Sequence, residues 1–195
     1  MTSEGRRERD RAVRERLIIA AARELAETQG WEAVTTRRLA ERVEYSQPVL
    51  YSHFKSKDAI MAAVAIEGFA DLASELVEAR NGADTGRNRA ALDALTAVAT
   101  AYLDFAERRP ALYDAMFSQA IAIPFAKPET PEPLRAGFGA LADVLAPFAT
   151  PDELGLLTET LWATLHGLVT LTRGDRLPRE LQDRRLAILL SRFTK

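Results

Sequence analysis

Cysteine is absent from this 195-residue sequence, and histidine occurs only twice. A chain without thiols has no disulfides, no thiolate metal sites and no cysteine nucleophile, and it fits a reducing compartment. No apolar run reaches the roughly 18 residues that a membrane-spanning helix needs. The first 16 residues hold too many arginines and acids for a secretory leader. These absences predict a cytoplasmic protein with no membrane partner.

Catalytic patterns are missing as well. The chain has no P-loop, dinucleotide-binding, nucleophile-elbow or zinc-protease sequence. His53 and His166 lie far apart in the sequence, and neither has a neighbouring nucleophile. We therefore expect a protein that is not an enzyme and that holds no metal or cofactor.

The formal net charge of −2 is unevenly distributed. Residues 1–58 contain 12 basic and 10 acidic side chains, a balance of +2, and the remainder contains 14 and 18, a balance of −4. Affinity for DNA depends on local charge, so the basic first part can approach phosphates while the acidic remainder stays away from them.

Helical periodicity fills the chain, and no stretch shows the sustained alternation of a sheet. The fold class is therefore predicted to be all-α. Four apolar residues recur at every fourth position and predict the inward face of a first helix that ends at Gly30: Val13, Leu17, Ala21 and Leu25.

Three further helix starts carry capping residues. Thr35 or Thr36 can cap a second helix, which turns Leu39 and Val43 inward, and Ser46 can cap a third. Ser56 begins a long helix that runs to the break at residues 81–82. The later helices are predicted at 88–108, 111–119, 133–147, 151–173 and 178–193, with a proline-rich loop at 120–132.

This pattern predicts two domains. Residues 1–58 form an N-terminal arm and a three-helix helix-turn-helix domain, and residues 59–195 form a helical bundle. Within the first domain, residues 35–58 read TTRRLAERVEYSQPVLYSHFKSKD. Two short helices joined by a tight turn place the second helix across the major groove of duplex DNA.

The same residues resemble the TetR family of transcriptional repressors. The Thr-Thr-Arg helix start, followed by Gln-Pro, Leu-Tyr, a His and a Lys, is most similar to the heads of the tetracycline-repressor members, over roughly residues 13–62. In the bundle, Leu165-His166-Gly167 resembles the Trp-His-Gly signature of one class of C-terminal domains. The resemblance implies a homodimeric repressor that a small-molecule effector releases from a palindromic operator. The alternative is a constitutive or architectural DNA-binding protein without ligand control.

One departure from the family concerns the turn. Glu44 and Tyr45 stand where members commonly have Gly and Val. The glycine position often requires a positive φ, which costs a residue with a β-carbon about 1 kcal/mol. The turn is therefore expected to be slightly strained.

Nine residues are candidates for DNA contact. Arg37 can form paired hydrogen bonds with guanine, and Gln47 can do so with adenine. Pro48 and Val49 offer apolar contacts to thymine methyl groups. Five others carry donors suited to phosphate oxygens: Thr36, Tyr51, Ser52, His53 and Lys57. The alternative is a solvated surface position for each cation and a packing role for the tyrosine ring.

Six arginines precede the helix-turn-helix, which we call the head. Three acids lie among them, so the local charge balance is +3: Arg6, Arg7, Arg9, Arg11, Arg14 and Arg16. They fit an arm inserted into the minor groove or a solvated extension of the first helix, and we prefer the second interpretation.

The bundle carries two further sets of candidates. Leucines at helical spacing on the last two helices predict a dimer interface, with internal packing as the alternative: Leu157, Leu161, Leu165, Leu168, Leu186 and Leu190. Aromatic and flexible apolar residues predict the pocket of a small apolar or amphipathic effector, with core packing as the alternative: Tyr102, Phe105, Tyr113, Met116, Phe117, Phe138 and Trp162.

Overall fold

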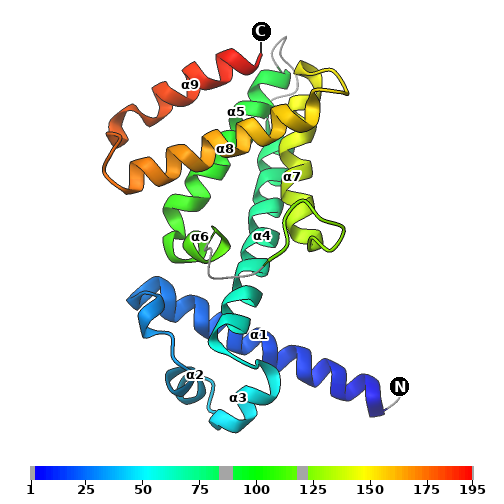
Figure 1. Ribbon diagram of the computed structural model, residues 1–195, viewed down its shortest axis with the longest axis vertical. Coiled ribbons are helices and arrows are strands. Elements are labelled where there is room, and N and C mark those ends of the chain that lie inside the picture. The colour runs from blue at the N-terminus through cyan, green and yellow to red at the C-terminus, as the bar shows by residue number, and fades with distance from the viewer. Residues whose placement is uncertain (1–2, 84–89, 118–122, 195) are drawn as a thin grey trace. The chain divides into compact units, whose positions relative to one another are not determined.

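The computed structural model describes residues 3–83, 90–117 and 123–194, and it confirms the all-α fold (Figure 1). The described α-helices are α1 (Ser3–Gln29), α2 (Thr36–Arg42), α3 (Gln47–His53), α4 (Lys57–Gly82), α5 (Ala90–Arg108), α6 (Pro110–Phe117), α7 (Glu132–Leu145), α8 (Leu154–Arg173) and α9 (Gln182–Phe193). Short 3-10 helices occupy Trp31–Ala33, Ala146–Phe148 and Arg179–Leu181. Over the described ranges, no helix is long and apolar enough to cross a membrane.

The ends of the first helices lie where the sequence predicts them. α1 stops before Gly30, whose φ of 80° suits a residue without a β-carbon. The Thr35 hydroxyl accepts a hydrogen bond from the Arg38 amide at 3.3 Å and caps α2. The Ser56 hydroxyl accepts one from the Ala59 amide at 3.1 Å at the start of α4. Local capping chemistry therefore sets these boundaries.

The later helices agree with the prediction within a few residues. α8 begins at Leu154 rather than at 151, after a turn in which the Thr150 hydroxyl donates to the Glu153 carboxylate at 2.7 Å. The expected helix over 178–193 is divided into a 3-10 turn and α9. Parts of the predicted segments, at 88–89 and 118–122, lie outside the described residues.

Contacts divide the chain into two compact units. Unit 1 comprises Met1–Gly68 with Arg109–Lys127, and unit 2 comprises Phe69–Arg108 with Pro128–Lys195. α6 therefore belongs to the same unit as the helix-turn-helix, although α5 separates them in the sequence. The functional boundary at residue 58 stays a prediction.

In unit 1, α1 buries Ala21 and Leu25 of the predicted row but not its first two residues. Val13 and Leu17 are 47% and 50% exposed, whereas Ile18, Ala22 and Leu25 are buried. Each step of four residues advances about 40° beyond a full turn, so a row of fours drifts off one helix face. Residues spaced alternately by three and by four stay on the same face of the helix.

α2, α3 and α6 all pack against α1. Of the two residues predicted to face inward on α2, Leu39 is fully buried and Val43 is only half-buried. Leu50 on α3 is fully buried as well. α4 also approaches α6 closely, because a β-carbon at Gly68 would lie 2.8 Å from side-chain atoms of Leu112 and Met116. The contacts with α1 hold the two short helices α2 and α3 in place.

In unit 2, α5 packs against α7, α8 and α9, and α7 packs against α8. Tyr102 and Phe105 on α5 are fully buried in this bundle. Two ion pairs tie its helices: Arg80 of α4 bonds Asp143 of α7, and the Arg108 guanidinium lies 2.6 Å from the Glu75 carboxylate.

The turn between α2 and α3 has the strained conformation expected of it. Glu44 has a φ of 57°, in the left-handed region that favours glycine. The Tyr45 amide donates to the Ala40 carbonyl at 2.9 Å, which closes the turn. The fold therefore holds a glutamate in a backbone conformation that glycine adopts at lower cost.

We expect the Glu44→Gly variant to be more stable by about 1 kcal/mol, because glycine removes the steric cost of the left-handed conformation. Urea unfolding of the wild type and the variant measures the difference. The same exchange at Glu78, inside α4, should instead lower stability by about 1 kcal/mol. A loss of stability at both positions would contradict the strained turn.

Candidate nucleic-acid interface

The outer surface of α3 displays a compact set of the predicted contact residues. Gln47 and Pro48 in its first turn are exposed, as is Ser52. Val49 is 37% exposed and Tyr51 50%, which is high for an apolar and an aromatic side chain. A short helix that presents amide, hydroxyl and apolar groups together can meet the edges of bases in a major groove.

α2 is held to α1 by charged side chains. The Arg38 guanidinium donates to the Gln29 side chain at 2.7 Å and to the Ala33 carbonyl at 3.4 Å. Arg42 forms an ion pair with Glu24. α2 therefore cannot rotate without breaking these bonds, and its first turn keeps a fixed place beside α3.

Arg37, in that first turn, is available for contact. Its side chain is 79% exposed and pairs with Glu41 at 3.0 Å along the same helix. An exposed pair of this kind contributes at most about 1 kcal/mol, so a DNA phosphate or base can displace it. Thr36 beside it is half-buried.

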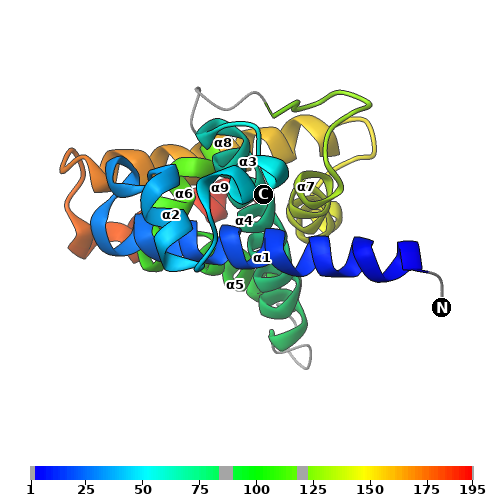
Figure 2. The same cartoon turned by 90° about the horizontal axis from the view of Figure 1, so that it is seen from below.

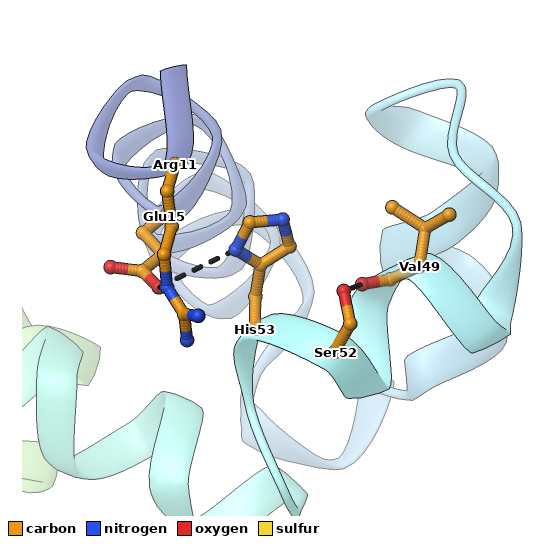
Figure 3. A network of polar contacts seen from close by, with 5 residues as sticks. All are labelled: Arg11, Glu15, Val49, Ser52 and His53. Carbon is orange, nitrogen blue, oxygen red and sulfur yellow. Dashed lines mark hydrogen bonds and ion pairs between the residues drawn. The ribbon is translucent and has the colours of Figure 1, made fainter. Parts of the chain in front are cut away.

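His53 has a structural partner on α1. Its side chain is only 6% exposed, and its Nδ1 lies 3.4 Å from the Glu15 carboxylate of α1, as Figure 3 shows. The ring therefore points toward α1 and not toward solvent. His53 therefore docks α3 on α1, and its predicted phosphate contact stays a prediction.

The same carboxylate also accepts from Arg11. The Arg11 Nε donates to Glu15 at 2.8 Å, one helical turn away (Figure 3). Burial opposes the ionisation of Glu15, but Arg11 and His53 outweigh it, so the pKa of Glu15 lies below its ordinary value. Glu15, which lies on α1, is thus held in its ionised form where α3 contacts that helix.

Lys57 has a structural partner. Its Nζ donates to the Trp31 carbonyl at 2.8 Å, and its side chain is half-buried. A lysine ammonium carries three donors, so this bond leaves others for a phosphate. The predicted phosphate contact stays a prediction.

Two residues that sequence reasoning missed join α6 to this unit. The Glu27 carboxylate accepts from the Ala111 and Leu112 amides at 3.1 and 2.8 Å, and it caps the N-terminus of α6. The Trp31 Nε1 donates to the Ala111 carbonyl at 2.7 Å. No local spacing signals either contact, since the partners are more than 75 residues apart in the sequence.

The predicted pocket residues fall into both units. Tyr113, Met116 and Phe117 lie on α6 in unit 1, where the Tyr113 and Phe117 rings pack with centroids 4.7 Å apart. The other four lie in unit 2: Tyr102 and Phe105, which are buried, Trp162, which is half-buried, and Phe138, which is 36% exposed. Their role in binding stays a prediction.

The predicted dimer row is largely buried within the single chain. Four of its six leucines are at most 5% exposed within the single chain: Leu161, Leu165, Leu186 and Leu190. Leu157 and Leu168 are half-buried. The four buried leucines pack in the core of unit 2, and an interface along the predicted row stays a prediction. The same helical spacing serves an internal core or an interface.

Comparison with known families identifies the chain. Residues 18–64 match the profile described as bacterial regulatory proteins, tetR family, and residues 95–193 match the tetracyclin repressor-like C-terminal domain. The chain belongs to the TetR family. It is therefore a transcriptional regulator with a DNA-binding helix-turn-helix, as the residues of α2 and α3 predicted. The Trp-His-Gly class of C-terminal domain stays a prediction.

Relatives of this TetR-family regulator match over different shares of the chain. It is 52% identical to the tetracycline repressor protein class C of Escherichia coli over 48 residues, which are 25% of this chain and 22% of the relative. It is 31% identical to the uncharacterized HTH-type transcriptional regulator YobS of Bacillus subtilis over 101 residues, 52% of this chain. That match spans half the length of the relative.

Solved structures share the fold over nearly the whole chain. A protein of unknown function from Rhodococcus sp. RHA1 matches with a TM-score of 0.74 and 24% identity, over 92% of both chains. The transcriptional regulator FadR from Bacillus subtilis, in complex with stearoyl-CoA, matches with a TM-score of 0.66 and 16% identity, over 92% of this chain and 97% of that one. At these identities the likeness shows the fold alone.

The placement of His53 gives a test. We expect His53→Ala to lower the free energy of unfolding by about 1–2 kcal/mol, because it removes a buried ring and its bond to Glu15. The dependence of DNA affinity on salt should stay unchanged, since no phosphate contact is lost. Urea unfolding and titrations of a DNA duplex at several salt concentrations measure the two quantities. A shallower salt dependence with unchanged stability would restore the phosphate contact.

Proposed function

We propose that this regulator is a cytoplasmic repressor that binds a palindromic operator as a homodimer and is released by a small apolar or amphipathic effector. The observation that carries the proposal is the exposed surface of α3. Gln47, Val49 and Tyr51 lie open to solvent on a helix whose inner side is locked by Leu50 and His53. A rigid helix with a polar outer face suits reading bases.

Reading and positioning fall to different residues in this proposal. Arg37 and Gln47 read guanine and adenine, and Pro48 and Val49 meet thymine methyl groups. Hydroxyl and ammonium donors contact phosphates and set the register: Thr36, Tyr51, Ser52 and Lys57. Sequence preference therefore depends on few side chains.

The burial of the leucine row moves the proposed dimer face to the opposite sides of α8 and α9. Leu156 and Leu171 of α8 are 69% and 41% exposed, and Ile188 of α9 is 55% exposed. Ala163, between the two leucines of α8, is exposed as well. Exposed apolar residues on two helices of the same unit favour association with a second copy. Two heads then reach two half-sites.

Support for an effector comes from unit 2 and from the family. Tyr102 and Phe105 are enclosed by the bundle, and Trp162 on α8 is half-buried. The FadR structure, which shares the fold, holds an amphipathic acyl-CoA. For release, the effector must bind the DNA-incompetent state better by a coupling energy of about 1–3 kcal/mol.

Selection of bound duplexes from random DNA tests the reading residues. We expect the wild type to enrich a palindromic sequence. The double variant Arg37→Ala, Gln47→Ala should lose about 5–150-fold discrimination at one or two positions of each half-site, since each paired contact contributes roughly 1–3 kcal/mol. Competition titrations with substituted duplexes measure the discrimination.

Tyr51→Phe serves as the matched control, because it removes a phosphate donor and should weaken binding to all duplexes alike. Failure of the wild type to enrich any sequence would overturn sequence-specific repression. A constitutive DNA-binding protein would keep its operator affinity in the presence of every molecule that occupies the bundle.

The dimer face has its own test. We expect the double variant Leu156→Asp, Ile188→Asp to sediment as a monomer at micromolar concentration with its helical circular dichroism retained, because a carboxylate on this face opposes association without entering the core. The Leu161→Asp variant should instead unfold. An unchanged dimer mass of the first variant would place the interface elsewhere.

A further inference from the structure

The N-terminal part of α1 extends beyond the part of the helix that is buried in the head. The buried residues of α1 begin at Ile18, whereas residues 6–14 are all exposed. Figures 1 and 2 both show the N-terminal turns of α1 extending past α2 and α3. This segment carries five of the six arginines that precede the helix-turn-helix, and the ion pair printed for it joins Arg11 to Glu15 on the same helix. It is therefore a strongly basic, exposed helical surface.

Three of these arginines lie on the face that packs in the head. Positions 7, 11, 14, 18, 21 and 25 follow one another in steps of four and three, so they form one line along a helix. The second half of this line is the buried row Ile18, Ala21 and Leu25, and α1 packs on α2 and α3. The first half consists of Arg7, Arg11 and Arg14, which we name the arginine row.

The arginine row therefore lies on the side of α1 that carries the helix-turn-helix. Figure 3 supports this placement, because Arg11 shares the Glu15 carboxylate with His53, the last residue of α3. Arg9 and Arg16 lie on another side. Positions 9, 16 and 23 are seven residues apart, so Arg23 lies on the same side of α1 as these two arginines. The Arg23 guanidinium lies 3.6 Å from the carboxylate of Glu67 on α4.

We propose that the arginine row is a second DNA surface, which contacts phosphates next to the base pairs that α3 reads. The proposal rests on the proposed function and names a part of the same binding surface. The row extends from Arg7 to Arg14, seven steps of about 1.5 Å or about 10 Å along the helix. The phosphates of one strand recur about every 3.4 Å along the axis, so a row of this length spans several of them. Glu8 and Asp10 flank the row, yet the segment keeps a balance of +3.

The helical form of the segment decides how it meets DNA. An α-helix with side chains is about 10–12 Å wide, and the minor groove of B-DNA is about 6 Å wide. A helix therefore does not enter that groove as an extended arm does. Guanidinium groups on its side bind the phosphate backbone as forked donors, without reading sequence.

A pair of matched double variants tests the arginine row. R7Q/R14Q removes two arginines of the row and leaves Arg11 with Glu15, whereas R9Q/R16Q removes the same charge from the other side of the helix. The duplex is the sequence selected by the wild type, with ten base pairs added at each end. We expect R7Q/R14Q to reduce the slope of log affinity against log salt by about 1.8 per protomer, at about 0.9 per phosphate contact. R9Q/R16Q should keep the wild-type slope.

Two further measurements sharpen the result. R7K/R14K should restore most of the slope, because lysine keeps the charge. Trimming the duplex to the selected sequence alone should remove the difference between R7Q/R14Q and the wild type. Equal slopes for the wild type and R7Q/R14Q, or an equal reduction in both double variants, would overturn the proposal while specific binding by α3 stands. If R7Q/R14Q binds DNA as the wild type does but loses binding to phosphatidylserine vesicles, the arginine row belongs to a membrane-binding surface. That result would overturn the proposal too.

Discussion

The packing of α1 against α2 and α3 is the interaction on which the DNA-binding unit depends. α1 carries the buried residues Ile18, Ala22 and Leu25 and packs on the two short helices, whose buried residues include Leu39 and Leu50. Removal of one such leucine costs about 2–5 kcal/mol, whereas an exposed ion pair contributes at most about 1 kcal/mol. The apolar core therefore fixes the position of α3, and the surrounding charged contacts adjust its orientation.

Chemistry that acts within a few residues could be predicted from the sequence. Gly30 ends α1, Thr35 and Ser56 cap the helices that follow them, and Glu44 takes the positive φ expected at that position. Each of these depends on a side chain and its own neighbouring backbone. The resemblance of the head to the TetR family rests on the same short segment, so the fold and the location of the DNA surface followed from it.

Contacts between distant residues could not be predicted. His53 has the same residue type and spacing whether its ring faces a phosphate or Glu15, and only the packing of α3 on α1 decides between them. The leucine row of α8 and α9 has the same periodicity in a core as at an interface, and burial assigns Leu161 and Leu190 to the core. Periodicity identifies the apolar face of a helix but not the element that covers it.

The capping of α6 by Glu27 makes the DNA-binding unit discontinuous in the sequence. During synthesis, residues 1–68 leave the ribosome well before the Ala111 and Leu112 amides that Glu27 caps and the Ala111 carbonyl that Trp31 bonds. The head therefore completes its packing only after α5 has been made. A chimaera that joins the first 68 residues to another bundle would leave a carboxylate and an indole without their backbone partners, so transplanting the head requires α6 to travel with it.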